Sequence, residues 1–293
     1  MPAERRLMME DTGLTRHLAL LTEYDGSGFF GWQIQKGQRT VQQVLRDALT
    51  RLTGEENVVL TGCSRTDAGV HARGHVSDFR TGSRIPTEKF HLALNSVLPK
   101  DVSVLAACDV PGEFNARFAA RGKIYTYRIW NTASRPALER KRACHIPGPL
   151  DLEAMAQAIP LLIGHHDFCA FRDSGSSNKT TIRTLNSIGL SVQEPLITLT
   201  FEGDGFLYHM VRILTGTLVA VAQGKLQPGR MTDLLSNGNR KLAGMTMPPE
   251  GLCLEQVHYA SILFENPKTY YVDLSQQLWD IKDQLLHENK QLI

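Results

Sequence analysis

Apolar residues recur along this chain with two different periods, and these periods predict the first elements of a fold. Residues 17–24 alternate with a period of two and lead into the turn sequence of residues 25–28, which predicts a strand followed by a glycine-rich bend. From residue 41 to 52 apolar residues recur every three or four positions, which predicts a helix. Thr40 is typical of a residue that caps such a helix, and Gly54 of one that ends it.

The same two periods predict further elements in both halves of the chain. Short runs bounded by glycine or proline are interpreted as strands, and longer runs with helical spacing as helices. The predicted strands cover residues 57–61, 74–80, 101–110, 123–131, 185–193, 196–203 and 252–259, and the predicted helices cover residues 85–98, 152–162 and 208–221.

This mixture of strands and helices predicts the α+β class. We expect two similar halves, each an antiparallel sheet with helices on one face, whose free faces form a central cleft. The predicted parts are a polar N-terminal lead (1–16), an N-terminal α+β domain (17–134), a connection rich in proline and basic residues (135–149), a C-terminal α+β domain (150–264) and a tail with one helix (265–293).

Composition and charge exclude several classes of protein. Of the 293 residues, 42% are hydrophobic and 21% are charged, as in folded domains and unlike disordered chains. The formal net charge is only +2, so a polyanionic partner must be held by local clusters of cations. The five cysteines show no zinc or disulfide spacing, and no apolar run suits a signal peptide or a membrane span. We therefore expect a cytoplasmic protein with no membrane association.

The stretch from residue 63 to 76 is the richest in chemically useful side chains. It lies between two predicted strands, where functional side chains are often placed. Asp67 precedes Ala68-Gly69, and a glycine there permits the positive φ of a tight turn that presents the carboxylate. An ordinary Asp turn with solvated neighbours has the same sequence.

A metal site is a second interpretation of this stretch. Asp67, His71, His75 and Asp78 carry ligand-type side chains at short spacing. Gly69 and Gly74 interrupt any helix that would turn them to one side, and no HExxH motif occurs. Histidines in such a stretch are more often hydrogen-bonded residues of a loop or strand.

Several short motifs, in order along the chain, carry a resemblance to a known family. They are RTDAGVHA (65–72), FNARF (114–118), YTYR (125–128) and FLYHMVR (206–212), with YDG (24–26), GWQ (31–33) and EGL (250–252). Together they resemble the tRNA pseudouridine synthase A family over about residues 17 to 260. Ser64 and His75 depart from the pattern, in which glycine and glutamine are usual.

The resemblance implies an enzyme that isomerises uridine to pseudouridine at positions 38, 39 and 40 of the tRNA anticodon stem-loop. The central cleft would then bind RNA, and the target base would be flipped out of its stack. The resemblance also implies a homodimer with tRNA as its partner, and a reaction that uses no metal and no cofactor.

The resemblance assigns roles to four residues. Asp67 matches the catalytic nucleophile, which attacks either the uracil ring or the sugar carbon, and Arg212 matches its basic partner on a buried helix. Tyr125 matches the catalytic tyrosine that stacks on the target base and takes a proton, and Leu252 matches an apolar residue that packs under the uracil. From the residues alone, a surface ion pair stays open for Arg212, and core packing stays open for Tyr125 and Leu252.

Further cations are candidates for binding RNA. Arg65 is predicted to bind substrate by filling the place of the flipped base, although it could also pair with Asp67 or Asp78. Other cations lie near aromatic residues or in a polar loop, as in RNA-binding surfaces, but solvated strands and loops share that composition. The predicted tRNA-binding residues are Arg117, Arg121, Lys123, Arg128, Lys179 and Arg183.

Two other classes of function remain open alongside the RNA isomerase. One is an RNA-binding module without catalysis, and the other is a metal-dependent hydrolase that uses Asp67, His71 and His75. The joint presence of Asp67, Tyr125 and Arg212 disfavours the first of these, because binding a polyanion needs no aspartate.

Overall fold

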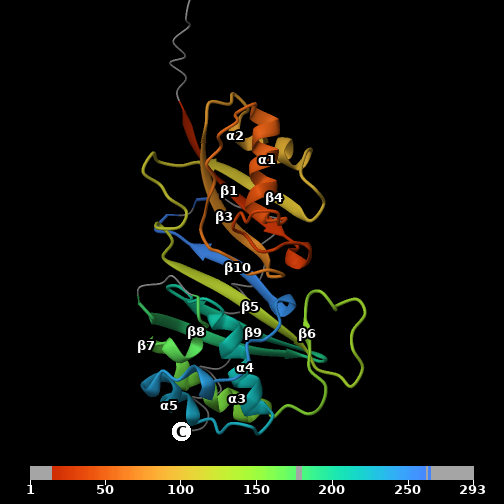
Figure 1. Cartoon of the computed structure of the whole chain (residues 1–293), viewed down its shortest axis with the longest axis vertical. Coiled ribbons are helices and arrows are strands. Elements are labelled where there is room, and N and C mark those ends of the chain that lie inside the picture. The colour runs from red at the N-terminus through yellow and green to blue at the C-terminus, as the bar shows by residue number, and fades with distance from the viewer. Residues whose placement is uncertain (1–14, 176–179, 262, 265–293) are drawn as a thin grey trace, which may run out of the picture.

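The first alternating segment forms an inner strand of one large sheet (Figure 1). β1 (Arg16–Tyr24) pairs antiparallel with β3 (His71–Thr81) on one side and with β4 (Val102–Asp109) on the other. The computed structural model describes residues 15–175, 180–261 and 263–264.

The remaining elements follow in the order of the chain. The other strands are β2 (Thr61–Gly62), β5 (Gly122–Trp130), β6 (Cys144–His145), β7 (Gly164–Asp167), β8 (Ile182–Gln193), β9 (Leu196–Gly203) and β10 (Leu252–His258). The α-helices of the described residues are α1 (Val41–Thr53), α2 (Thr87–Asn95), α3 (Leu152–Ala158), α4 (Met210–Ala222) and α5 (Arg230–Asn237).

The last strand joins the two halves of the molecule. The strand order is β4-β1-β3-β10-β5-β9-β8-β7, so β10 lies between β3 and β5, parallel to the first and antiparallel to the second (Figure 1). The predicted α+β class is confirmed. The sheets of the two halves are not separate, however, because β10 pairs with both and leaves no open strand edge between them. The Asp67 loop that precedes β3 therefore lies close to elements of the second half.

Helices cover the sheet at both ends of the molecule. α1 and α2 lie over β1 and β4, whereas α3 and α5 lie at the opposite end (Figure 1). α4 is the most buried helix, since all its residues except Arg212 and Ala220 are buried. An arginine that enters the core on such a helix requires a partner, because an unpaired charge is costly to bury.

Several details of the elements differ from the prediction. Thr40 caps α1 through its position alone, since its side chain makes no cap hydrogen bond, whereas Gly54 ends the helix at φ 77° as expected. The strand predicted at 57–61 is reduced to β2. The helix predicted from residue 208 begins at Met210, because His209 has the left-handed φ of 61°.

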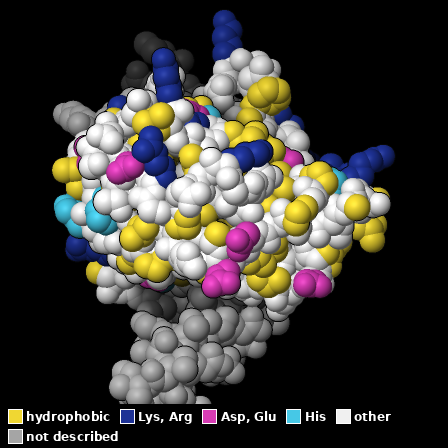
Figure 2. Space-filling model, turned by 90° about the horizontal axis from the view of Figure 1, so that it is seen from below, with side chains coloured by type: hydrophobic (Ala, Val, Ile, Leu, Met, Phe, Trp, Pro, Cys, Tyr) yellow, Lys and Arg dark blue, Asp and Glu magenta, His cyan; other side chains and the backbone are white. Residues whose placement is uncertain are grey.

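The outer surface agrees with the low net charge. Basic, acidic and apolar side chains are interspersed over the end that carries α3 and α5 (Figure 2). No helix of the described residues is long and apolar enough to cross a membrane. Most of the predicted lead and tail lies outside the described residues.

Candidate active site

The Asp67 loop is a tight turn, as its sequence predicts. The backbone N–H of Val70 donates a hydrogen bond to the carbonyl oxygen of Asp67 at 3.2 Å, and Gly69 has φ 80°. A Cβ atom on Gly69 would lie 2.8 Å from Cγ of Pro249. Glycine is therefore required by both the backbone angle and the close approach of the chain before β10.

A neighbouring segment of the first half fixes the loop in place. The Tyr24 hydroxyl lies 2.8 Å from Oγ1 of Thr66, and the backbone N–H of Trp32 donates to the Thr66 carbonyl at 3.0 Å. Gly31 has φ 84°, and a Cβ atom there would lie 2.5 Å from the same carbonyl. The YDG and GWQ motifs therefore hold the backbone next to Asp67.

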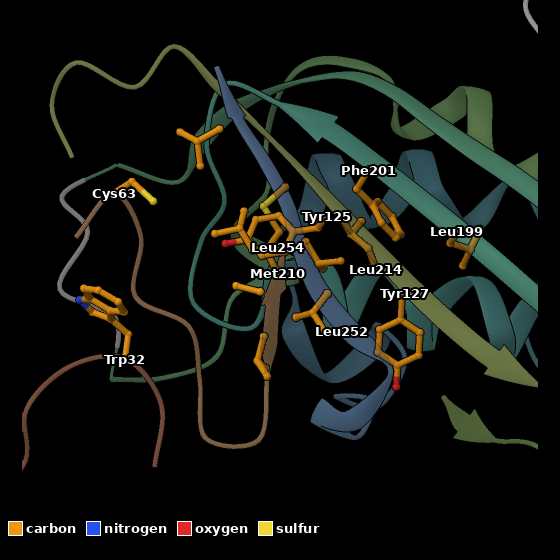
Figure 3. Close-up of a cluster of buried hydrophobic side chains, with 14 of the residues drawn as sticks. Trp32, Cys63, Tyr125, Tyr127, Leu199, Phe201, Met210, Leu214, Leu252 and Leu254 are labelled. Carbon is orange, nitrogen blue, oxygen red and sulfur yellow. The ribbon is translucent and has the colours of Figure 1, made fainter. Parts of the chain in front are cut away.

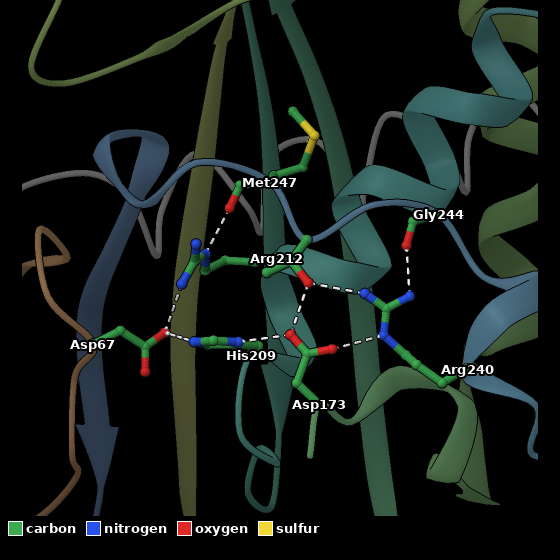
Figure 4. Close-up of polar contacts among 8 residues, drawn as sticks. Asp67, Asp173, His209, Arg212, Arg240, Gly244 and Met247 are labelled. Atoms are coloured by element: carbon green, nitrogen blue, oxygen red, sulfur yellow. Dashed lines mark hydrogen bonds and ion pairs between the residues drawn. The ribbon is translucent and has the colours of Figure 1, made fainter. Parts of the chain in front are cut away.

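Asp67 and Arg212 contact each other although they are distant in sequence. Nη1 of Arg212 lies 3.1 Å from Oδ2 of Asp67, and Nε of Arg212 donates to the Met247 carbonyl at 2.6 Å (Figure 4). The side chains of Asp67 and Arg212 are 20% and 12% exposed. The arginine that enters the core on α4 thus has its ionic partner at the edge of a cleft.

A second group, His209, contacts the same carboxylate oxygen. Nε2 of His209 lies 3.4 Å from Oδ2 of Asp67, and its Nδ1 lies 2.8 Å from Oδ2 of Asp173. Burial alone would raise the pKa of Asp173, but hydrogen bonds from His209, Thr246 and Arg240 outweigh it and lower this pKa to about 2. Asp173 is therefore an ionised acceptor that orients the His209 ring (Figure 4).

This supporting network was not predicted from the sequence. His209 stands inside the FLYHMVR motif, which was the available signal, and its positive φ turns the ring toward Asp67. The network engages Oδ2 of Asp67. Among the described residues no hydrogen bond or ion pair involves Oδ1, which points away from Arg212 and His209 in Figure 4.

Apolar groups lie beside the charged pair. Tyr125, Leu252 and Leu254 face one another from β5 and β10, and Met210 and Leu214 of α4 complete the cluster (Figure 3). Tyr125 is 6% exposed, and burial raises its pKa. Its hydroxyl lies 3.1 Å from Oγ of Ser64, so the hydroxyl has a polar partner in this apolar setting.

Charged and apolar groups meet in one cleft of about 1060 Å³. Asp67, Arg212, Tyr125 and Leu252 line it, together with Arg65, Arg117, Lys123 and Arg183. Burial lowers the pKa of Lys123, and the nearby charges of Arg117 and Arg183 lower it further, partly opposed by Cys63. These cations are therefore close enough to repel one another, which favours an anionic ligand between them.

Comparison with known proteins identifies the family. A model of the tRNA pseudouridine synthase family matches residues 20–119 and 158–260. The chain belongs to this family. Over 244 residues, which are 83% of this chain and the whole of each relative, it is 46% identical to tRNA pseudouridine synthase A of Caldicellulosiruptor bescii and 45% identical to that of Acetivibrio thermocellus. It is 43% identical over the same span to tRNA pseudouridine synthase A 2 of Clostridium perfringens.

Members of the tRNA pseudouridine synthase family convert uridine to pseudouridine, so the predicted resemblance and the isomerase class are confirmed. Both matched segments include residues of the cleft. The first contains Asp67 and the second contains Arg212, so the pair is formed between the two segments that the family model matches.

The structure brings only some of the predicted RNA-binding cations to the cleft. Arg121 is exposed but does not line it. Arg128 pairs with Glu139 at 3.1 Å and lines a separate, smaller hollow. Lys179 lies outside the described residues. Arg65 is exposed and makes no ion pair within the described part of the chain, so the alternative pairings with Asp67 and Asp78 are not formed.

The four side chains considered as metal ligands have different partners. Asp78 lies 2.9 Å from His17, and His71 accepts a hydrogen bond from the backbone of Gly26. His75 stacks on Trp32 with ring centroids 3.7 Å apart, and burial lowers the pKa of His75 to about 3. Across residues 15–175, 180–261 and 263–264, no three ligand-type side chains form a cluster that could hold a metal.

Proposed function

We propose that this chain isomerises uridine to pseudouridine at positions 38, 39 and 40 of the tRNA anticodon stem-loop. The observation that carries the proposal is the Asp67 carboxylate. Its Oδ2 is held by Arg212 and His209, while its Oδ1 is left for a substrate beside Tyr125 and Leu252. A charged nucleophile beside an apolar, aromatic surface suits a uracil ring and its ribose.

In the proposed reaction Oδ1 of Asp67 is the nucleophile. It attacks either C1′ of the ribose or C6 of the uracil, and both adducts lead to the same exchange of bonds. The bond from N1 to C1′ breaks, the bond from C5 to C1′ forms, the bond to Oδ1 of Asp67 breaks again and restores the carboxylate, C5 loses a proton and N1 gains one. Arg212 balances the charge of the carboxylate and fixes its direction, so the attacking oxygen is aimed before the base arrives.

Tyr125 is proposed to stack on the target uracil, with Leu252 packed under it. Because burial raises its pKa, Tyr125 keeps its own proton near neutral pH. A proton that leaves C5 for the Tyr125 oxygen must therefore be matched by one that the phenol gives up. Oγ of Ser64, 3.1 Å away, can accept that proton while its own hydroxyl proton passes to solvent in the open cleft, so that Ser64 stays neutral.

Binding is proposed to require extrusion of the target base, which costs a few kcal/mol. Arg65, exposed on the loop two residues before Asp67, is proposed to occupy the vacated place. Arg117, Lys123 and Arg183 would contact phosphates, since they line the same cleft. A homodimer that extends this surface is proposed from the family resemblance and is testable by sedimentation.

The test uses tRNA transcripts that carry uridine, tritiated at C5, at only one of positions 38, 39 and 40. The protein is expected to release tritium from each transcript in the presence of EDTA. Release from none of them would contradict the proposed substrate positions. Release that EDTA abolishes would favour a metal-dependent reaction instead.

A further inference from the structure

The exposed aromatic side chains of this molecule are not spread over its surface. In the described residues, three aromatic side chains are more than a third exposed: Phe118 (81%), Phe30 (52%) and Tyr208 (42%). All three line the cleft that contains Asp67. They come from three separate segments of the chain, so their meeting in one cleft results from the fold and not from a local cluster in the sequence.

Exposed aliphatic side chains provide an internal control. The described residues include nine large aliphatic or methionine side chains that are similarly exposed, and none of them lines the cleft. They are Val59, Leu92, Leu138, Leu161, Ile163, Ile182, Val192, Leu242 and Met245. The cleft is therefore selectively rich in flat rings, which suits stacking on planar groups better than general apolar docking.

Hydrogen bonds hold the backbone at Phe118, although its ring is exposed. Oδ1 of Asn115 accepts hydrogen bonds from the backbone N–H groups of Arg117 and Phe118, both at 3.1 Å. The N–H of Ala116 donates to Asp78 at 2.7 Å, and the Tyr259 hydroxyl donates to the Ala116 carbonyl at 2.8 Å. The ordering cost of this loop backbone is met within the protein, so a base that stacks on Phe118 does not have to order the loop first.

A cation accompanies the exposed ring. The Arg117 guanidinium lies 5.6 Å from the centre of the Phe118 ring, and Lys123 and Arg183 line the same cleft. A ring for a base beside cations for phosphates is the combination that proteins use to bind unpaired nucleotides.

We propose that Phe118, assisted by Phe30 and Tyr208, stacks on unpaired bases of the RNA that flank the target uridine. The proposal rests on the proposed function for the presence of RNA in the cleft. It adds a binding element that is distinct from the groups that react with the target base.

The experiment measures affinity for a stem-loop RNA in variants that share an Asp67→Asn background, so that turnover does not interfere. Phe118→Ala is expected to weaken binding about 5- to 100-fold, the range for loss of one stacked base. Phe118→Trp is expected to retain affinity. Leu138→Ala is the matched control, because Leu138 is 91% exposed and lies outside the cleft, and it is expected to bind like the parent.

Two further readouts separate stacking from other contributions. Phe118→Ala is expected to leave the salt dependence of binding unchanged, because a ring releases no counterions. In a series of stem-loops that each lack one base, one abasic site is expected to weaken the binding of the parent protein but not the binding of Phe118→Ala. Parent-like affinity of Phe118→Ala, or equal losses for Ala and Trp, would overturn the inference.

The outcome for Phe118 is separable from the proposed function. If the wild-type protein releases tritium from tRNA but Phe118→Ala binds normally, only the stacking inference fails. If the wild-type protein releases none, the proposed function fails independently of Phe118.

Discussion

Two hollows of this molecule contain several cations each, yet they differ in how those cations are used. In the smaller hollow, of about 230 Å³, two of the four lining cations are paired, Arg73 with Glu255 at 2.7 Å and Arg128 with Glu139 at 3.1 Å, and none of the exposed aromatic rings of the described residues lines it. In the larger cleft, Arg65, Arg117, Lys123 and Arg183 make no ion pair with any described residue, and exposed rings lie beside them.

This difference shows why a count of basic residues is a poor guide to an RNA site. A cation that is already paired with a carboxylate offers little to a phosphate, because the existing pair must be broken first. Cations without an acidic partner repel one another and attract a polyanion. The site is therefore better located by unpaired cations beside aromatic faces than by cations alone.

Of the substitutions that test this comparison, one at Arg212 is expected to have the largest effect on the rate of reaction. Arg212→Gln leaves the Asp67 carboxylate without its closest cation, and we expect the rate of tritium release from tRNA to fall by about 10²- to 10³-fold. Single-turnover kinetics measure it. Arg128→Gln removes an arginine from the smaller hollow and is expected to react at nearly the wild-type rate. Equal rates for Arg212→Gln and wild type would show that the charged pair is structural only.

The dependence of folding stability on acid pH should distinguish two histidines of β3. His71 lines the smaller hollow, and His75 packs behind the wall of the larger cleft. His75 stacks on Trp32 of the cleft wall and has a pKa lowered to about 3 by burial. The unfolded chain binds a proton there near pH 6.5, so stability is fully present above that pH and is lost as the pH falls toward 3. We expect a loss of about 2 kcal/mol between about pH 7 and pH 5.

Urea unfolding at the two pH values tests this expectation. His75→Gln is expected to reduce the loss. His71→Gln is the control and is expected to change it less, because the contact of His71 with Asp25 opposes the lowering of its pKa by burial. A pH dependence that His75→Gln leaves unaltered would show that a different group controls acid stability.

Salt dependence tests the difference between paired and unpaired cations directly. Arg117→Ala is expected to weaken tRNA binding and to lower the slope of log affinity against log salt by about 1, the value for one phosphate contact. Arg128→Ala is expected to change neither quantity, because Arg128 is already paired with Glu139. The measurement is a filter-binding titration over a range of salt. A lower slope for Arg128→Ala would mean that the smaller hollow also contacts RNA.

A smaller effect is expected at Asp173, which contacts Asp67 only through His209. Asp173→Asn keeps a hydrogen-bond acceptor but removes the charge that orients His209, and we expect kcat to fall about 3- to 10-fold with tRNA affinity preserved. Asp233→Asn, an exposed aspartate on α5, is a suitable control. A change in affinity without a change in kcat would show that Asp173 shapes the RNA surface and does not position Asp67.

The fold was predictable from the sequence where burial is periodic. β1, β9 and α1 occur within one or two residues of their predicted bounds, since alternation and helical spacing directly reflect which side chains are buried. The position of β10 between β3 and β5 was not predictable, because periodicity describes one strand and not its neighbours. The later start of α4 depends on the single backbone angle of His209.

The contacts of the site were predictable to the extent that motifs contain them. Asp67, Tyr125 and Arg212 stand in separate motifs, and the structure brings all three to one cleft. Asp173 stands in no motif and lies in a loop 36 residues before His209, so only the folded chain shows their contact. The pairing of Arg128 with Glu139 was equally hidden, because the partner lies in a segment without periodicity.

The most direct test of the account is tritium release by Asp67→Asn, a nearly isosteric change that removes the nucleophile. Release from tRNA tritiated at uracil C5 is expected to fall to background, while tRNA affinity stays within about threefold of wild type. Asp204→Asn removes the same charge from the same cleft and is expected to retain release. Release by Asp67→Asn at the wild-type rate would contradict the central claim that this carboxylate reacts with the nucleoside.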